Sequence, residues 1–79
     1  MALKINTNDF ETGTVRFMDF EGGFFGIITD EGKHYDPINL ESDYQIDGLR
    51  IHFKAKIRDD LGSFHMWGTI IEITWIEKI

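Results

Sequence analysis

The chain has 79 residues, enough for one domain at most, and it contains no cysteine, which excludes a disulfide scaffold, a thiolate metal site and a cysteine nucleophile. Eight Lys and Arg side chains against fourteen Asp and Glu leave a net charge of −6, which favours solubility and opposes attraction to nucleic-acid phosphates. The N-terminal residues lack the apolar run of a signal peptide, and no apolar stretch approaches the roughly 18 residues of a membrane span, so we expect a cytoplasmic protein.

The first residues predict little regular structure. Residues 1–9 are polar and show no periodicity, so we expect a flexible segment that leads into a single domain over residues 10–79. β-branched and aromatic residues then dominate residues 11–20 and predict a first strand, with Val15 and Phe17 on one face.

A hairpin follows the first strand. Gly22-Gly23 stands between two apolar runs and predicts the turn, and the sequence FFGIIT predicts a second strand over residues 24–29. Gly26 within this strand indicates a bulge or a place of close backbone approach. A turn at residues 30–32 precedes a short third strand over residues 33–36.

The fourth strand is the clearest element of the sequence. Pro37 cannot continue a central strand, so residues 37–48 form a connection, with a short helical turn predicted over residues 41–45. Residues 49–58 then alternate between apolar and polar side chains without a violation. The side chains expected to face the core are Leu49, Ile51, Phe53, Ala55 and Ile57. Those expected to face outward are Arg50, His52, Lys54, Lys56 and Arg58.

Residues 59–63 predict a loop, and residues 65–79 predict a last strand that bends at Gly68. Four apolar residues share one face of this strand and predict a core stripe, with a binding interface as the alternative: Trp67, Ile71, Ile73 and Trp75. Ile70 and Ile76 lie on the opposite face, so part of the strand is apolar on both sides. Its outer side must be covered by the N-terminal segment, by a bulge that switches faces, or by a partner.

Three strands, a long connection and two further strands are the order of the OB fold. We therefore predict an all-β, five-stranded, OB-like Greek-key barrel with a short helical turn between the third and fourth strands. An SH3-like barrel and a small open sheet are the alternatives.

Three segments follow one another in the first half of the chain: Gly13-Thr14-Val15-Arg16-Phe17-Met18-Asp19, then Gly22-Gly23-Phe24-Phe25-Gly26-Ile27-Ile28, then Asp30-Glu31-Gly32. Together they resemble the start of a cold-shock domain, an OB-fold family that binds single-stranded RNA and DNA. The family's lysine and two of its aromatic residues are replaced by Gly22, Met18 and Ile27, so the resemblance implies the topology rather than the binding. The segments Asp47-Gly48-Leu49-Arg50 and His65-Met66-Trp67-Gly68-Thr69 resemble small uncharacterised OB-like domains of archaea and some bacteria.

One candidate binding surface is aromatic. The second and third predicted strands, where OB folds stack the bases of single strands, carry Phe24, Phe25, His34 and Tyr35. Packing within the barrel is the interpretation that we favour for them. The flanking loops carry acidic residues that would repel phosphates, namely Asp19, Glu21, Asp59 and Asp60.

The other candidate surface is the outer face of the fourth strand, which we call the basic row: Arg50, His52, Lys54, Lys56 and Arg58. Its members stand about 7 Å apart, a spacing that could follow a phosphate backbone or bind an acidic partner. We favour a solvated face that cross-strand acids such as Glu72 and Glu11 balance.

No constellation predicts catalysis or metal binding. His34 and Asp36 share a strand face, but His52 and His65 are scattered, and a tetrahedral metal site needs three or four converging ligands. Both serines and the paired carboxylates fall in predicted loops and turns. We expect no metal, no cofactor and no enzyme activity.

We therefore expect a non-catalytic OB-like binding module for a protein partner or for self-association, with no membrane partner. Its contact surface is predicted on the outer flank of the fourth strand. A single-stranded nucleic-acid-binding protein is the alternative, and it requires exposed aromatic residues on a continuous positive surface.

Overall fold

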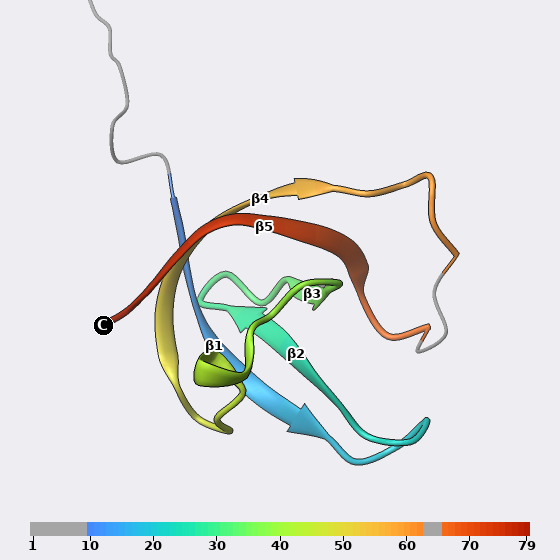
Figure 1. Ribbon diagram of the computed structural model, residues 1–79, viewed down its shortest axis with the longest axis horizontal. Coiled ribbons are helices and arrows are strands. Elements are labelled where there is room, and N and C mark those ends of the chain that lie inside the picture. Colours follow the sequence, from blue (N-terminus) through green and yellow to red (C-terminus); the bar gives the residue numbers. More distant parts are fainter. Residues whose placement is uncertain (1–9, 63–65) are drawn as a thin grey trace, which may run out of the picture.

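The computed structural model describes residues 10–62 and 66–79 of the chain. Five strands close into one barrel (Figure 1): β1 (Glu11–Met18), β2 (Phe24–Thr29), β3 (His34–Pro37), β4 (Arg50–Ile57) and β5 (Thr69–Lys78). The order around the barrel is β1-β2-β3-β5-β4, with β4 pairing back onto β1 and with β3 and β5 running parallel. A 3-10 turn, η1 (Ser42–Tyr44), lies between β3 and β4. The predicted five-stranded OB-like barrel with one helical turn is confirmed, and neither alternative architecture forms.

Some predictions fall outside the described residues: the flexible segment 1–9, Ser63 of the last loop, and His65 at the start of the last predicted strand. Within the described part, the last strand starts at Thr69, and Gly68 lies against β3 just before it. A Cβ atom at position 68 would lie only 2.6 Å from the His34 carbonyl oxygen, so glycine permits this close approach.

Pro37 belongs to β3, which corrects the prediction that the strand ends at residue 36. The proline is the last residue of the strand and pairs with Ile71 of the parallel strand β5. The ladder continues through the next residue, since the Ile38 amide donates to the Ile71 carbonyl at 2.9 Å. Because proline lacks an amide hydrogen, it is tolerated at such a strand end and not in the middle.

The β1–β2 turn centres on Glu21 and Gly22, one residue earlier than predicted. The Gly23 amide donates to the Phe20 carbonyl at 2.9 Å, and both central residues have positive φ angles, 51° and 85°. This is the type I′ geometry that fits the twist of a hairpin. Glutamate rarely adopts positive φ, so the turn holds Glu21 in a strained backbone conformation.

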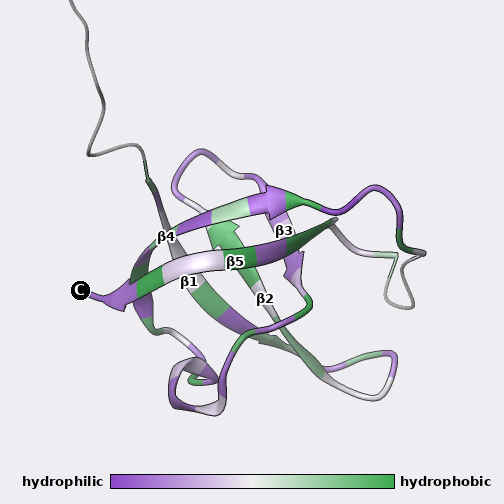
Figure 2. Cartoon of the chain, turned by 45° about the horizontal axis from the view of Figure 1, so that its top comes forward, coloured by the Kyte–Doolittle hydropathy of each residue, from purple (hydrophilic) through white to green (hydrophobic). Residues whose placement is uncertain are grey.

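The core is formed by side chains from all five strands and the β3–β4 connection. Val15, Ile27, Ile51, Phe53 and Ile71 are fully buried, and Tyr35 and Leu40 complete the cluster. The alternation that places them inside is visible as bands of hydrophobic and hydrophilic colour along β4 and β5 (Figure 2).

β4 extends beyond the residues that pair with β1. It pairs with β1 from Arg50 to Phe53 and beyond that point has β5 as its neighbour. Ile51 and Phe53 are buried as predicted, but Ile57 is 62% exposed, contrary to the prediction that it faces the core. Ile57 lies beyond the last residue of β4 that pairs with β1, so in the described part of the chain only β5 flanks the strand there.

A bulge in β5 switches which face of the strand points inward. Lys54 of β4 pairs with Trp75 whereas Ala55 pairs with Ile73, which leaves Thr74 as the extra residue. Ile71 is buried and Ile73 packs on the core before the bulge, and Ile76 packs on it afterwards. Trp75 is therefore turned outward and 38% exposed, which corrects its prediction as a core residue.

One of the predicted explanations for the doubly apolar last strand, a bulge that switches faces, is confirmed. Asn39 holds the bulge by accepting from the Ile73 amide at 2.8 Å and donating to the Ile73 carbonyl at 2.9 Å. The predicted cover by the N-terminal segment falls on residues outside the described part of the chain. Phe10, the first described residue, packs on the outward-turned Trp75, with ring centroids 5.9 Å apart, and reduces the apolar surface that the strand leaves to solvent.

Candidate functional site

The two arginines of the basic row are held by carboxylates. Arg50 donates to both oxygens of Asp30, at 2.6 and 2.9 Å. Arg58 donates to both oxygens of Asp60 at 2.9 Å and also to Glu72 at 2.9 Å. Such two-pronged pairs are the strongest geometry that an exposed arginine can form.

These ion pairs shift the pKa values of the groups that form them. Hydrogen bonds from Arg50 lower the pKa of Asp30, and those from Arg58 lower the pKa of Asp60 to about 2. The same contacts raise the pKa of Arg58. Both arginines thus remain fully charged, but their charge is matched within the protein.

The rest of the basic row is also engaged, except at one position. His52 lies 3.4 Å from Glu77, and the Lys54 ammonium lies 5.6 Å from the centre of the Trp75 ring. Lys56 is exposed and pairs in register with Glu72 of β5. The row therefore offers less positive charge to a ligand than its sequence predicts.

Glu11 does not balance the basic row, contrary to prediction. Its side chain lies at the edge of the barrel interior, where Glu11 Oε2 accepts a hydrogen bond from the Tyr35 hydroxyl at 3.3 Å. The Lys33 ammonium lies 4.0 Å from its other oxygen. Burial and the negative charge of Glu11 raise the pKa of Tyr35.

The aromatic candidates are mostly inside the protein. Phe24 and Tyr35 are each 9% exposed, and the Tyr35 ring packs edge-on against Phe53 in the core, with centroids 6.0 Å apart. Phe25 is half-buried, and of the four predicted residues His34 alone is exposed. These rings do not form a platform on which bases could stack.

Trp67 covers the outer face of β2 and β3. Its ring lies on the backbone of Gly26, where a Cβ atom would overlap the indole. It also stacks on His34, with centroids 4.6 Å apart and planes 11° from parallel, and meets Phe24 edge-on at 5.8 Å. This face is the usual OB ligand surface, and here a side chain from the β4–β5 connection occupies it. The sequence prediction of Trp67 as part of a core stripe is thus wrong. At Gly26 a side chain makes the close approach, in place of the predicted bulge or backbone neighbour.

A groove opens at the end of the barrel where the β1–β2 turn and η1 lie, at the lower end in Figure 1. Its volume is about 340 Å³, and its apolar lining is Phe17, Phe24, Phe25, Pro37, Ile38 and Leu40. We call it the apolar groove. Gly23, Asp36 and Gln45 complete the lining. Phe17 and Ile38 are 45% and 48% exposed, so apolar surface remains open to solvent there.

Of the residues that line the apolar groove, only Phe24 and Phe25 were candidate site residues by sequence, and the groove itself was not predicted. The Phe17 ring packs against that of Phe25, with centroids 5.2 Å apart, beyond the level at which β4 covers β1. Ile38 and Leu40 come from the β3–β4 connection, where alternation gives no prediction of direction. The signal present was that Ile38 and Leu40 are apolar residues in a segment predicted to be a connection.

Acidic residues stand in both of the loop segments that supply lining residues to the apolar groove. Asp19 and Glu21 belong to the β1–β2 turn, and Glu41 and Asp43 belong to the β3–β4 connection. All four are exposed, and none forms an ion pair within residues 10–62 and 66–79. We call them the acidic rim.

The cations nearest this end of the barrel are already engaged. Arg16 donates to Asp47 at 3.1 Å, and the Lys78 ammonium lies 5.5 Å from the centre of the Tyr44 ring. The groove therefore combines open apolar surface with unmatched negative charge.

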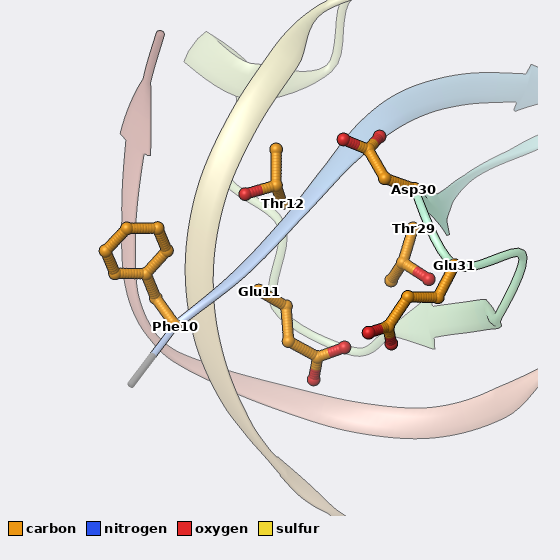
Figure 3. Close-up of a pocket in the computed structure, with 6 residues that line it drawn as sticks. All are labelled: Phe10, Glu11, Thr12, Thr29, Asp30 and Glu31. Atoms are coloured by element: carbon orange, nitrogen blue, oxygen red, sulfur yellow. The ribbon is translucent and has the colours of Figure 1, made fainter. Parts of the chain in front are cut away.

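A second pocket, of about 280 Å³, lies at the opposite end of β2 (Figure 3). Glu11 and Glu31 aim their carboxylates toward one side of it, whereas the Asp30 carboxylate points the other way. Lys33 lies between the first two, at 4.0 and 3.4 Å, and Arg50 holds the third. These carboxylates are matched by cations, and in the described part of the chain no three His, Asp or Glu side chains group to hold a metal ion.

The chain matches no protein-family model, no curated protein and no solved structure. Across the described ranges, no helix is long and apolar enough to cross a membrane.

Proposed function

We propose that this protein is a non-catalytic binding module whose partner is another protein. The observation that carries the proposal is the contrast between two surfaces. The arginines of the basic row are bound to carboxylates of the same chain, whereas the acidic rim forms no ion pair with any described residue and adjoins open apolar side chains. Exposed apolar surface with a polar border is typical of protein-binding sites.

A partner different from this chain is favoured over a second copy. In a two-fold symmetric dimer the same patch meets itself, so a dimer formed through the groove would bring two acidic rims together. Like charges placed opposite each other in an interface cost binding energy. A monomer in size-exclusion chromatography with light scattering is therefore expected, and a stable dimer would contradict this choice.

Single-stranded nucleic acid is the second candidate, and one contact favours it. The parallel stack of Trp67 on His34 lies on the face where OB folds bind single strands, and it could extend to a base. Against it stand the acidic rim and the matched arginines, since binding to single strands depends on free cations that displace counterions from phosphates.

Two measurements on the same preparation separate these candidates. A random peptide library displayed on phage is selected against the full chain, and we expect a related set of sequences to be enriched. Labelled single-stranded DNA and RNA are titrated at about 50 mM salt, where phosphate contacts are strongest, and we expect no binding. Tight oligonucleotide binding without peptide enrichment would overturn the proposal.

A further inference from the structure

We propose that the apolar groove binds a peptide segment with one or two large apolar side chains flanked by lysine or arginine. This inference rests on the proposed function and adds the place of binding and the chemistry of the partner. It follows from the size of the groove and from the charge around it.

The size of the groove limits what it can hold. A volume of about 340 Å³ lies near the lower end of ligand pockets, which span roughly 300–1,000 Å³. Such a space accepts one or two apolar side chains rather than a whole folded surface. The half-exposed ring of Phe17, the partly buried ring of Phe25 and the Ile38 side chain would contact these anchors. Binding would thus bury apolar surface that the free protein leaves in water.

The charge around the groove selects the flanks of the peptide. Asp19 and Glu21 belong to the turn that supplies Gly23 to the lining, and Glu41 and Asp43 belong to the connection that supplies Ile38 and Leu40. None of the four forms an ion pair within the described ranges. A chain that crosses the groove from the turn to the connection would therefore pass negative charge on both sides of its apolar anchors. Basic residues at both ends complement this pattern, and acidic residues would be repelled.

The β1–β2 turn and η1, which carry or adjoin these acids, lie at one end of the barrel, and the β2–β3 turn lies at the other (Figure 2). Glu31 at that turn is thus remote from the groove, and Glu77 near the end of β5 lies opposite His52 of the basic row and outside the lining of the groove. They provide a control that removes the same charge from a different place.

The test uses three fluorescein-labelled synthetic peptides of about twelve residues. The first has a phenylalanine and a leucine at its centre and two lysines at each end. The second has glutamates in place of the lysines, and the third has serines in place of the apolar pair. By fluorescence anisotropy we expect the first to bind the full chain at least about tenfold more tightly than either of the others. Equal affinity for the first and second peptides would overturn the proposal that the groove selects basic flanks.

Matched variants locate the binding. Ile38→Arg places a charge in the groove and should weaken the first peptide at least about tenfold, whereas Ile57→Arg adds the same charge on β4 and should leave it unchanged. The pair Glu21→Gln with Glu41→Gln should weaken it more than Glu31→Gln with Glu77→Gln. All six residues are exposed, so circular dichroism should show a folded barrel in each variant. Equal effects in both members of either comparison would overturn the groove as the site.

Failure of this inference is distinguishable from failure of the proposed function. If the displayed library yields binders that Ile38→Arg does not weaken, or binders without basic flanks, the protein is a binding module that uses another surface. If the library yields no binders at all, both proposals are wrong.

Discussion

The ring of Trp67 lies directly on the backbone of Gly26, so close that a single methyl group at position 26 would overlap the indole. Gly26 is thus a glycine because of a residue 41 positions later in the sequence, and not because of its own backbone angles. The contact ties the β4–β5 connection to the outer face of β2. It also places a tryptophan where an OB fold usually leaves room for a ligand.

The first prediction tests this contact by adding the methyl group. Gly26→Ala should lower the free energy of unfolding by about 1–3 kcal/mol, because the indole must move to make room. Urea unfolding followed by circular dichroism measures the change. Gly62→Ala is the control, since no atom of the described residues beyond its chain neighbours lies within 4 Å of its Cβ position, and it should change stability by no more than about 0.5 kcal/mol.

A double-mutant cycle assigns the effect to Trp67. If the indole is the obstacle, Gly26→Ala should cost much less in a chain that already carries Trp67→Ala. Equal costs in both backgrounds would show that the strand backbone, and not the indole, makes position 26 intolerant.

The second prediction concerns the bulge in β5. Asn39→Ala removes both hydrogen bonds to Ile73 and should lower the free energy of unfolding by about 1–2 kcal/mol. Asn39→Asp should destabilise at least as much, because a carboxylate can accept from the Ile73 amide but cannot donate to the Ile73 carbonyl. An aspartate variant as stable as the parent would show that the amide donor is not needed.

The third prediction follows from the positive φ angle of Glu21. Glu21→Asn should raise the free energy of unfolding by about 0.5–1 kcal/mol, since Asn-Gly is the preferred pair for a type I′ turn. Asp19→Asn removes the same charge from the same loop without a positive φ, and it should stabilise less. If the two variants gain equally, charge repulsion rather than backbone strain is the cause. We also expect Glu21→Asn to bind the lysine-flanked peptide less tightly, because the variant loses a charge of the acidic rim. The protein would then keep the strained glutamate because its charge contributes to binding.

The fourth prediction concerns acid stability. The pKa of Asp60 is lowered to about 2 by Arg58, that of Asp30 is lowered by Arg50, and that of Asp47 is lowered by the Phe17 amide and Arg16. A carboxyl group with a lowered pKa stabilises the fold above its ordinary pKa near 3.8, and this contribution is lost as the pH falls toward the folded value. The free energy of unfolding should therefore decrease between pH 4 and pH 2.

Asp60→Asn tests the sign of this dependence. The variant should be less stable than the parent at neutral pH and should lose less stability on acidification, as measured by urea unfolding across the same pH range. Asp59→Asn, whose side chain forms no ion pair in the described part of the chain, should leave the slope unchanged. A parallel loss of stability in parent and Asp60→Asn would contradict the role of the pair.

The alternation of β4 predicted the barrel because each step of the strand faces either core or solvent, and Ile51 and Phe53 lie where that rule places them. The rule fails at Ile57 because the strand continues after its neighbour β1 has ended. It fails at Trp75 because one extra residue, Thr74, reverses the parity of everything after it. Neither cause is visible within the strand itself.

The candidate site was harder to predict than the fold for a related reason. The apolar groove brings together the end of β1, the start of β2 and the β3–β4 connection, and each of these segments has its own periodicity or none. The pairing of Arg50 with Asp30 likewise joins β4 to the β2–β3 turn. Charge counts along one strand could not reveal it.

The central claim is that the partner binds at the apolar groove, and a two-dimensional ¹H–¹⁵N NMR titration with the lysine-flanked peptide tests it most directly. We predict the largest shifts for the amides of Gly23, Phe25, Ile38 and Leu40, with small shifts along the basic row. Shifts confined to residues 50–58, or to Gly26 and His34 beneath Trp67, would contradict it.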